Sequence, residues 1–98
     1  MSLDPKKVAI EVEKALTSSG KLRILRLLMK SPDHAFTRYE IGKQIPLSPA
    51  DIKNGLSVLV KIGWVKELIL QHLQKYSINM DNELVIQFTD FFRKIRYV

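Results

Sequence analysis

The chain has 98 residues, of which 46% are hydrophobic and 27% charged, and these proportions are typical of one small globular domain. It carries 16 basic and 10 acidic residues, and the resulting net charge of +6 favours a polyanionic partner. It has no cysteine and no apolar run of about 18 residues, which excludes disulfides, thiolate metal sites and a membrane span. The opening MSLDPKK lacks the apolar core of a secretory signal, so we expect a cytoplasmic protein.

Two helices are predicted in the first third of the chain. Asp4 and Pro5 form a typical helix start, and the apolar residues that follow recur on one face, which predicts a helix over residues 5–17. The stretch Thr17-Ser-Ser-Gly20 ends it. The next segment, KLRILRLLMK, is apolar around most of its circumference and predicts a helix over residues 20–30 at the centre of the core.

Two matching phrases then start two more helices. Thr37-Arg-Tyr-Glu40 and Ser48-Pro-Ala-Asp51 each place a hydroxyl three residues before a carboxylate, which is the pattern of a capping box. They predict helices over residues 37–45 and 49–62, separated by a tight turn at Pro46-Leu47. In the second of these helices Ile52, Leu56 and Leu59 have the spacing of one buried face. Gly63 fits the left-handed position after the helix end.

After Gly63 the apolar pattern changes to that of strands. WVKELIL and KYSINM predict strands over residues 64–70 and 75–80, joined at residues 71–74. The joint contains neither glycine nor asparagine, so its turn type stays open. A last helix is predicted over residues 82–97.

These elements, in this order, predict a winged helix-turn-helix: a mainly α fold with a small β-hairpin, forming one domain over residues 1–98. The two capped helices make the helix-turn-helix, and the hairpin that follows makes the wing. A small helical bundle with a hairpin is the alternative.

Three segments also resemble a known family. LRILRLLMKSP, FTRYEIGKQIPLSPADIKNGLSVLVKIGWV and KYSIN are similar to the arsenic-repressor and multiple-antibiotic-resistance (ArsR/MarR-like) winged-helix regulators, over residues 22–79. The resemblance implies a DNA-binding transcriptional regulator that is usually a homodimer. The chain departs from that family at the wing, which reads QHLQK where arginine and glycine are usual, and near Asn54, where the family often has arginine.

The residue types favour double-stranded DNA as the partner, because the second helix of a helix-turn-helix enters the major groove. Asn54 can pair with adenine, and Lys53 can reach guanine or a phosphate. Ser48 stands at a helix N-terminus, which suits a phosphate. The predicted DNA-binding set is Thr37, Arg38, Tyr39, Lys43, Ser48, Pro49, Ala50, Lys53, Asn54, Ser57, Lys61, His72, Gln74 and Lys75.

The terminal helices are predicted to form a homodimer interface, because the last helix has more apolar surface than a core of this size absorbs. Packing of that helix on the first helix of the same chain is the alternative. The predicted interface set is Val8, Val12, Leu84, Val85, Phe88, Phe91, Phe92 and Ile95.

Neither an enzyme nor a cofactor is predicted. No catalytic triad, glycine-rich phosphate loop or pair of carboxylates stands out, and His34 and His72 have no partner at metal-ligand spacing. The main alternative to DNA binding is a winged helix that serves as a protein-interaction module. It would use the last helix or the apolar hairpin, which carries Leu68, Ile69, Leu70 and Leu73.

Overall fold

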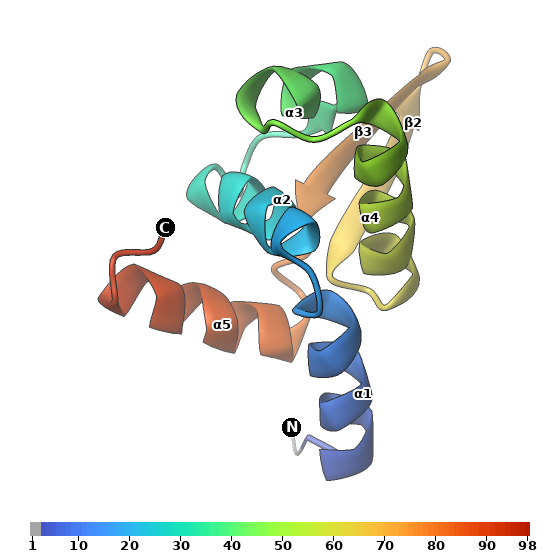
Figure 1. Ribbon diagram of the computed structural model, residues 1–98. Coiled ribbons are helices and arrows are strands. Elements are labelled where there is room, and N and C mark those ends of the chain that lie inside the picture. The colour runs from blue at the N-terminus through green and yellow to red at the C-terminus, as the bar shows by residue number, and fades with distance from the viewer. Residues whose placement is uncertain (1–2) are drawn as a thin grey trace.

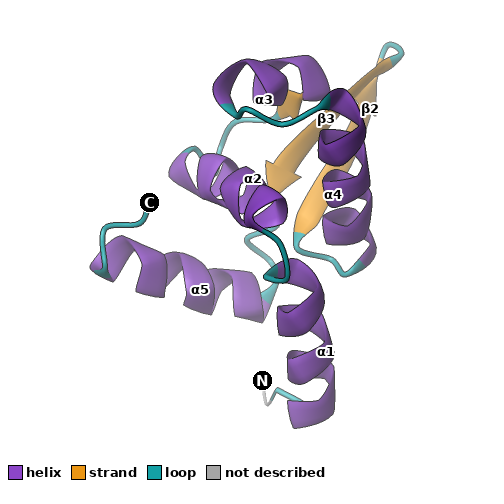
Figure 2. Ribbon diagram, viewed as in Figure 1, coloured by secondary structure: helices purple, strands orange, loops and turns teal. Residues whose placement is uncertain are grey.

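The structure, a computed structural model that describes residues 3–98, has five helices and a three-stranded sheet in those residues (Figure 1). The elements in chain order are α1 (Pro5–Ala15), α2 (Ser19–Lys30), β1 (Phe36–Thr37), α3 (Arg38–Gln44), α4 (Pro49–Lys61), β2 (Val65–Leu70), β3 (Leu73–Ile78) and α5 (Glu83–Lys94). The strands are antiparallel in the order β1-β3-β2 (Figure 2). The predicted winged helix-turn-helix fold is therefore confirmed.

Side-chain caps mark the first residues of the helices. They explain why some observed helix limits differ from the predicted ones. Ser18 accepts a hydrogen bond from Lys21 N at 3.2 Å, so α2 begins at Ser19 rather than at residue 20. Helix α1 ends at Ala15 rather than at residue 17. Thr37 and Glu40 form both halves of the predicted capping box, at 3.1 and 2.9 Å. Ser48 instead supplies only one half of its box, accepting from Asp51 N at 3.1 Å. The shorter aspartate side chain explains the missing return bond.

The core is centred on α2, as the sequence predicts. Ile24, Leu25, Leu28 and Met29 of this helix are fully buried. α4 crosses α2 closely, because a Cβ at Gly55 would lie only 3.1 Å from Cδ1 of Ile24. None of the helices in residues 3–98 combines the length and hydrophobicity that crossing a membrane requires.

The hairpin is tighter than the sequence suggests. β3 begins at Leu73 rather than at residue 75, and it ends at Ile78 rather than at residue 80. Gln71 and His72 alone make the turn, with φ of 47° and 70°. Two successive left-handed residues define a type I′ geometry, which suits a two-residue hairpin. Pairing of β2 with β3 therefore forms this turn although the turn contains neither asparagine nor glycine.

Strand β1 was not predicted, since two residues carry no periodicity. It forms because Phe36 pairs with Tyr76 and Thr37 pairs with Lys75. β1 therefore ties the start of α3 to the wing.

The last helix is shorter than predicted and ends at Lys94 instead of residue 97. Arg96 adopts a left-handed conformation with φ of 64°, and the N–H of Tyr97 then donates to the carbonyl of Phe92 at 2.7 Å. Arg26 of α2 holds this tail by donating from Nε to the Tyr97 carbonyl, also at 2.7 Å.

Candidate nucleic-acid interface

Helix α4 has one buried face and one open face. Ile52, Leu56 and Leu59 are buried in the core, as predicted. The opposite side is exposed to solvent, and among residues 3–98 no element covers it (Figure 1). The exposed residues of α4 are Pro49, Ala50, Asp51, Lys53, Asn54, Ser57 and Lys61. The helix therefore projects a polar face along most of its length.

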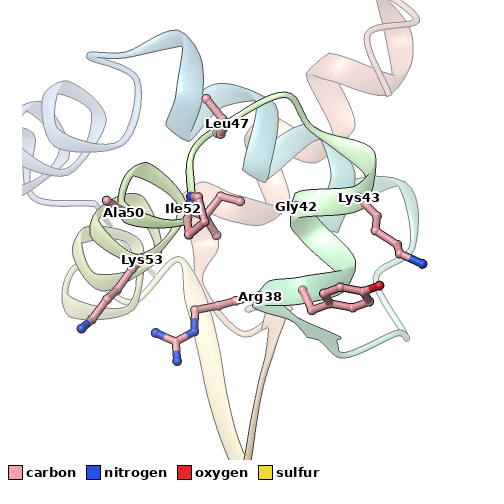
Figure 3. A pocket seen from close by; sticks show the side chains of 9 residues that line it. Arg38, Gly42, Lys43, Leu47, Ala50, Ile52 and Lys53 are labelled. Atoms are coloured by element: carbon pink, nitrogen blue, oxygen red, sulfur yellow. The ribbon is translucent and has the colours of Figure 1, made fainter.

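A hollow of about 710 Å³ lies between α3 and the start of α4 (Figure 3). Its floor is apolar and includes Leu47 and Ile52. Three cationic side chains line it: Arg38 and Lys43 come from α3, and Lys53 comes from α4. No carboxylate is among its lining residues, so the hollow suits an anionic partner.

Tyr39 stands on the rim of this hollow and is 71% exposed. The Nζ of Lys43 lies 4.9 Å from the centre of its ring, a cation–π contact that holds both side chains at the surface. An aromatic ring beside cations can pack against a sugar while the cations bind phosphates.

A second crevice, of about 280 Å³, separates α4 from the inner face of the wing. Its cations are Lys61 and two that it shares with the first hollow, Arg38 and Lys53. Gln74 of β3 faces them. Glu67 and Tyr76 also line the crevice, and neither was predicted as a site residue. Burial, followed by the neighbouring Glu67, raises the pKa of the Tyr76 hydroxyl. Side chains alternate between the two faces of β2, so Glu67 lies on the same face as the buried Val65. This two-residue alternation is the sequence signal that could have identified Glu67 as a lining residue.

The structure gathers some predicted DNA-binding residues and separates others. Arg38, Tyr39 and Lys43 share one surface with the open face of α4. The hydroxyls of Thr37 and Ser48 are already engaged as helix caps. The wing residues divide by strand alternation, because His72 lies in the turn and Gln74 faces the crevice while Lys75 faces the other side of the sheet.

Glu40 is an electrostatic element behind this surface. The backbone N–H of Thr37 donates to its carboxylate and is the main reason that the pKa of Glu40 is below its ordinary value. His34 lies 3.5 Å from the same carboxylate and lowers this pKa further. The charged form of Glu40 therefore stabilises the start of α3.

The predicted dimer residues fall into two groups. Leu84, Val85 and Phe92 are buried within their own chain, and Val8, Val12 and Phe88 are partly buried. Phe91 and Ile95 stand more than half exposed on α5. Ile10 of α1 and Ile86 of α5, which were not predicted, are also exposed.

A metal centre receives no support from the described part of the chain. Within residues 3–98, no three histidine, cysteine, aspartate or glutamate side chains are placed to share an ion. His34 lies beside Glu40 and His72 lies at the hairpin turn, so the two histidines are in different regions.

No protein-family model matches the sequence, and no curated protein matches it. Solved structures match the fold. HlyU from Vibrio cholerae is similar with a TM-score of 0.75 and 18% identity, covering 95% of this chain and 97% of HlyU. A protein of E. coli described as a predicted DNA-binding transcriptional regulator has a TM-score of 0.74 and 22% identity, covering 92% of this chain and 90% of its own.

A third similar structure is the winged helix-turn-helix DNA-binding domain Mb0332 from Mycobacterium bovis. It is homodimeric, is described as a possible ArsR-family transcriptional regulator, and has a TM-score of 0.69 and 21% identity, with coverage of 97% of this chain and 88% of the domain. The predicted resemblance is confirmed at the level of the fold, since one further neighbour is described as an ArsR family transcriptional regulator and Mb0332 as a possible one. Identities this low establish the shared fold alone.

Proposed function

We propose that this chain is a transcriptional regulator that binds double-stranded DNA as a homodimer and reads it with α4. The observation that carries the proposal is the open face of α4, which joins a surface lined by cations from α3. A helix with its side chains is about 10–12 Å across, and the DNA major groove is about 12 Å wide. The open face is therefore the right size and polarity for that groove.

Base reading is assigned to two neighbouring residues on this face. Asn54 presents a carboxamide whose N–H can donate to N7 of adenine while its carbonyl oxygen accepts from the N6 amino group of the same base. Lys53 lies one residue earlier and can reach a guanine or a phosphate. Both side chains are exposed, so neither must break a protein contact before binding.

Phosphate binding is assigned to cations on both sides of α4. Arg38 and Lys43 belong to α3 on one side of α4, and Lys61 of α4 lies on the other side, toward the wing. Cations in these positions can neutralise both DNA strands that border the groove. Such contacts fix the register of the protein without reading sequence.

The dimer is assigned to α1 and α5, which lie at the end of the molecule away from α3 (Figure 1). Phe91 and Ile95 would be the anchors, with Ile10 and Ile86 nearby in the exposed apolar set. A two-fold dimer formed there leaves α4 and the wing free. Its two copies of α4 would enter successive major grooves about 34 Å apart, on a near-palindromic site.

Salt titration of binding to a random-sequence duplex tests the proposal. If the dimer neutralises about 6–10 phosphates, its affinity should fall by roughly 10³–10⁵ between about 50 and 200 mM salt. Lys43→Ala should reduce the slope of log affinity against log salt by about 1. Lys7→Ala, which removes an exposed lysine of α1, is the matched control and should leave the slope unchanged. A flat salt response for the unmodified protein would refute DNA binding.

A further inference from the structure

The tip of the wing is aliphatic where the rest of the proposed DNA surface is polar. Ile69, Leu70 and Leu73 surround the turn and are 66%, 56% and 53% exposed. These three residues are called the wing tip below. Exposed aliphatic side chains at the end of an edge hairpin favour aggregation unless a partner covers them.

Strand register puts these side chains on both faces of the hairpin. Leu70 pairs with Leu73 across the strands, so this pair shares one face. Ile69 pairs with Gln74 and lies on the other face, toward α4. The tip therefore carries aliphatic side chains on both faces, with Gln74 as the polar neighbour of Ile69 on the inner face.

The hairpin is narrow and stiff at this point. Pairing continues up to Leu70 and Leu73, and only Gln71 and His72 lie outside it. The backbones of paired strands are about 4.8 Å apart before side chains are added, and the DNA minor groove is about 6 Å wide, so the groove must widen to admit the tip. Figure 1 shows the hairpin extending beyond the helices to a free end. A tip of this shape can enter the minor groove once the two phosphate strands that border the groove are spread apart.

Cations flank the wing tip on both faces. Arg38, Lys53 and Lys61 line the crevice on the inner side, where Glu67 is the one carboxylate among the lining residues. Lys75 lies on the outer side, where it pairs with Leu68 just below the tip. An apolar projection with three cations on one side and one on the other is complementary to a groove, whose floor of stacked bases lies between two phosphate strands.

We propose that the wing tip is an apolar wedge that inserts into the minor groove next to the α4 site and unstacks one base step, which bends the duplex. The inference rests on the proposed function and deepens it. Wedges of leucine or isoleucine bend DNA by about 20–90° toward the major groove. The wedge also adds sequence preference without base hydrogen bonds, because TA and CA/TG steps unstack most easily.

The test uses duplexes that the unmodified protein retains from a random pool, each substituted with 2-aminopurine at one flanking position at a time. Binding should raise 2-aminopurine fluorescence at one step on each side of the site, and energy transfer between labelled ends should report a bend. The double variant Leu70→Ser/Leu73→Ser should abolish both signals and weaken binding by roughly tenfold or more. Its circular dichroism and melting temperature report whether it remains folded.

Leu68→Ser is the matched control, because Leu68 is an exposed leucine on the same face but two residues farther from the turn. It should retain the fluorescence rise and the bend. Bound duplex without unstacking, or equal losses in the control and the tip variant, would overturn the wedge and leave DNA binding intact. A tip variant that changes the oligomeric mass would show that a second copy or another protein covers the tip, and this too would overturn the wedge. Absence of any retained duplex would refute the proposed function itself.

Discussion

Asn54 is the residue on which the proposed sequence reading depends most. It lies on the open face of α4, one turn from the helix start at Pro49, and it is exposed. The N-terminal residues of a recognition helix are those that reach base edges. A carboxamide here is informative because its donor and acceptor fit adenine as a pair, whereas a lysine is a point charge with less directional preference.

Asn54→Ala should therefore reduce discrimination between the preferred duplex and a random duplex by about 1–3 kcal/mol. Binding to the random duplex should change little, since phosphate contacts dominate it. Competition titrations with both duplexes measure the difference. An equal loss on both duplexes would reassign Asn54 to the DNA backbone.

Glu40 acts through the stability of α3. Because its pKa is lowered in the folded chain, the charged carboxylate stabilises the fold above the unfolded-state value, and this contribution is lost as the pH falls through the lowered pKa. Glu40→Gln should melt at a lower temperature than the unmodified protein at neutral pH. The difference should shrink as the pH falls below 4.5, the ordinary pKa of this group. Thermal melts over that pH range provide the measurement, and a constant difference would contradict the assignment.

At the scale of elements, the helix-turn-helix and the wing have different origins. The limits of α3 and α4 follow from caps at Thr37 and Ser48, which act within three residues. The wing depends on pairing across the sheet, including the pairing of Phe36 with Tyr76 that creates β1. Its turn also holds two non-glycine residues in left-handed backbone, which costs roughly 1–2 kcal/mol for each residue.

Replacing the turn by Asn-Gly, with Gln71→Asn and His72→Gly, should remove most of that strain. We expect the free energy of unfolding to rise by only roughly 1 kcal/mol, measured by urea denaturation, because the added glycine also makes the unfolded chain more flexible. The same substitution at a turn of another type would destabilise the hairpin, so a lower stability would contradict the type I′ geometry.

At the scale of the whole molecule, the surfaces proposed for DNA binding and for dimerisation lie at two different ends. The cationic surface of α3 and α4 lies at one end together with the wing, while α1 and α5 lie at the other (Figure 2). Burial of Leu84, Val85 and Phe92 inside the chain shows that α5 contributes to its own core. The remaining exposed face, with Phe91 and Ile95, is what a second copy would cover.

Phe91→Glu combined with Ile95→Glu should convert the proposed dimer to a monomer of 11.3 kDa, observable by sedimentation. The monomer should remain folded, because both side chains are more than half exposed. Leu68→Glu places a charge on an exposed leucine at the other end and should leave the mass unchanged. An unchanged mass for the double variant would contradict the α5 interface.

The sequence by itself determined the helices, their order and the open face of α4. These features depend on signals that act within a few residues: the hydroxyl caps, the spacing of Ile52, Leu56 and Leu59, and the left-handed Gly63 with its φ of 83°. Fold class and most proposed DNA contacts could therefore be predicted before any tertiary contact was known.

Only the tertiary structure decided which side chains share a surface. Glu67 and Tyr76 reach the crevice beside α4 because antiparallel pairing aligns residues nine positions apart, and strand alternation sends Lys75 to the opposite face. Burial likewise separated Phe92 from Phe91, although they are adjacent in sequence. The physical reason is that exposure and proximity depend on packing between distant segments, which no local pattern encodes.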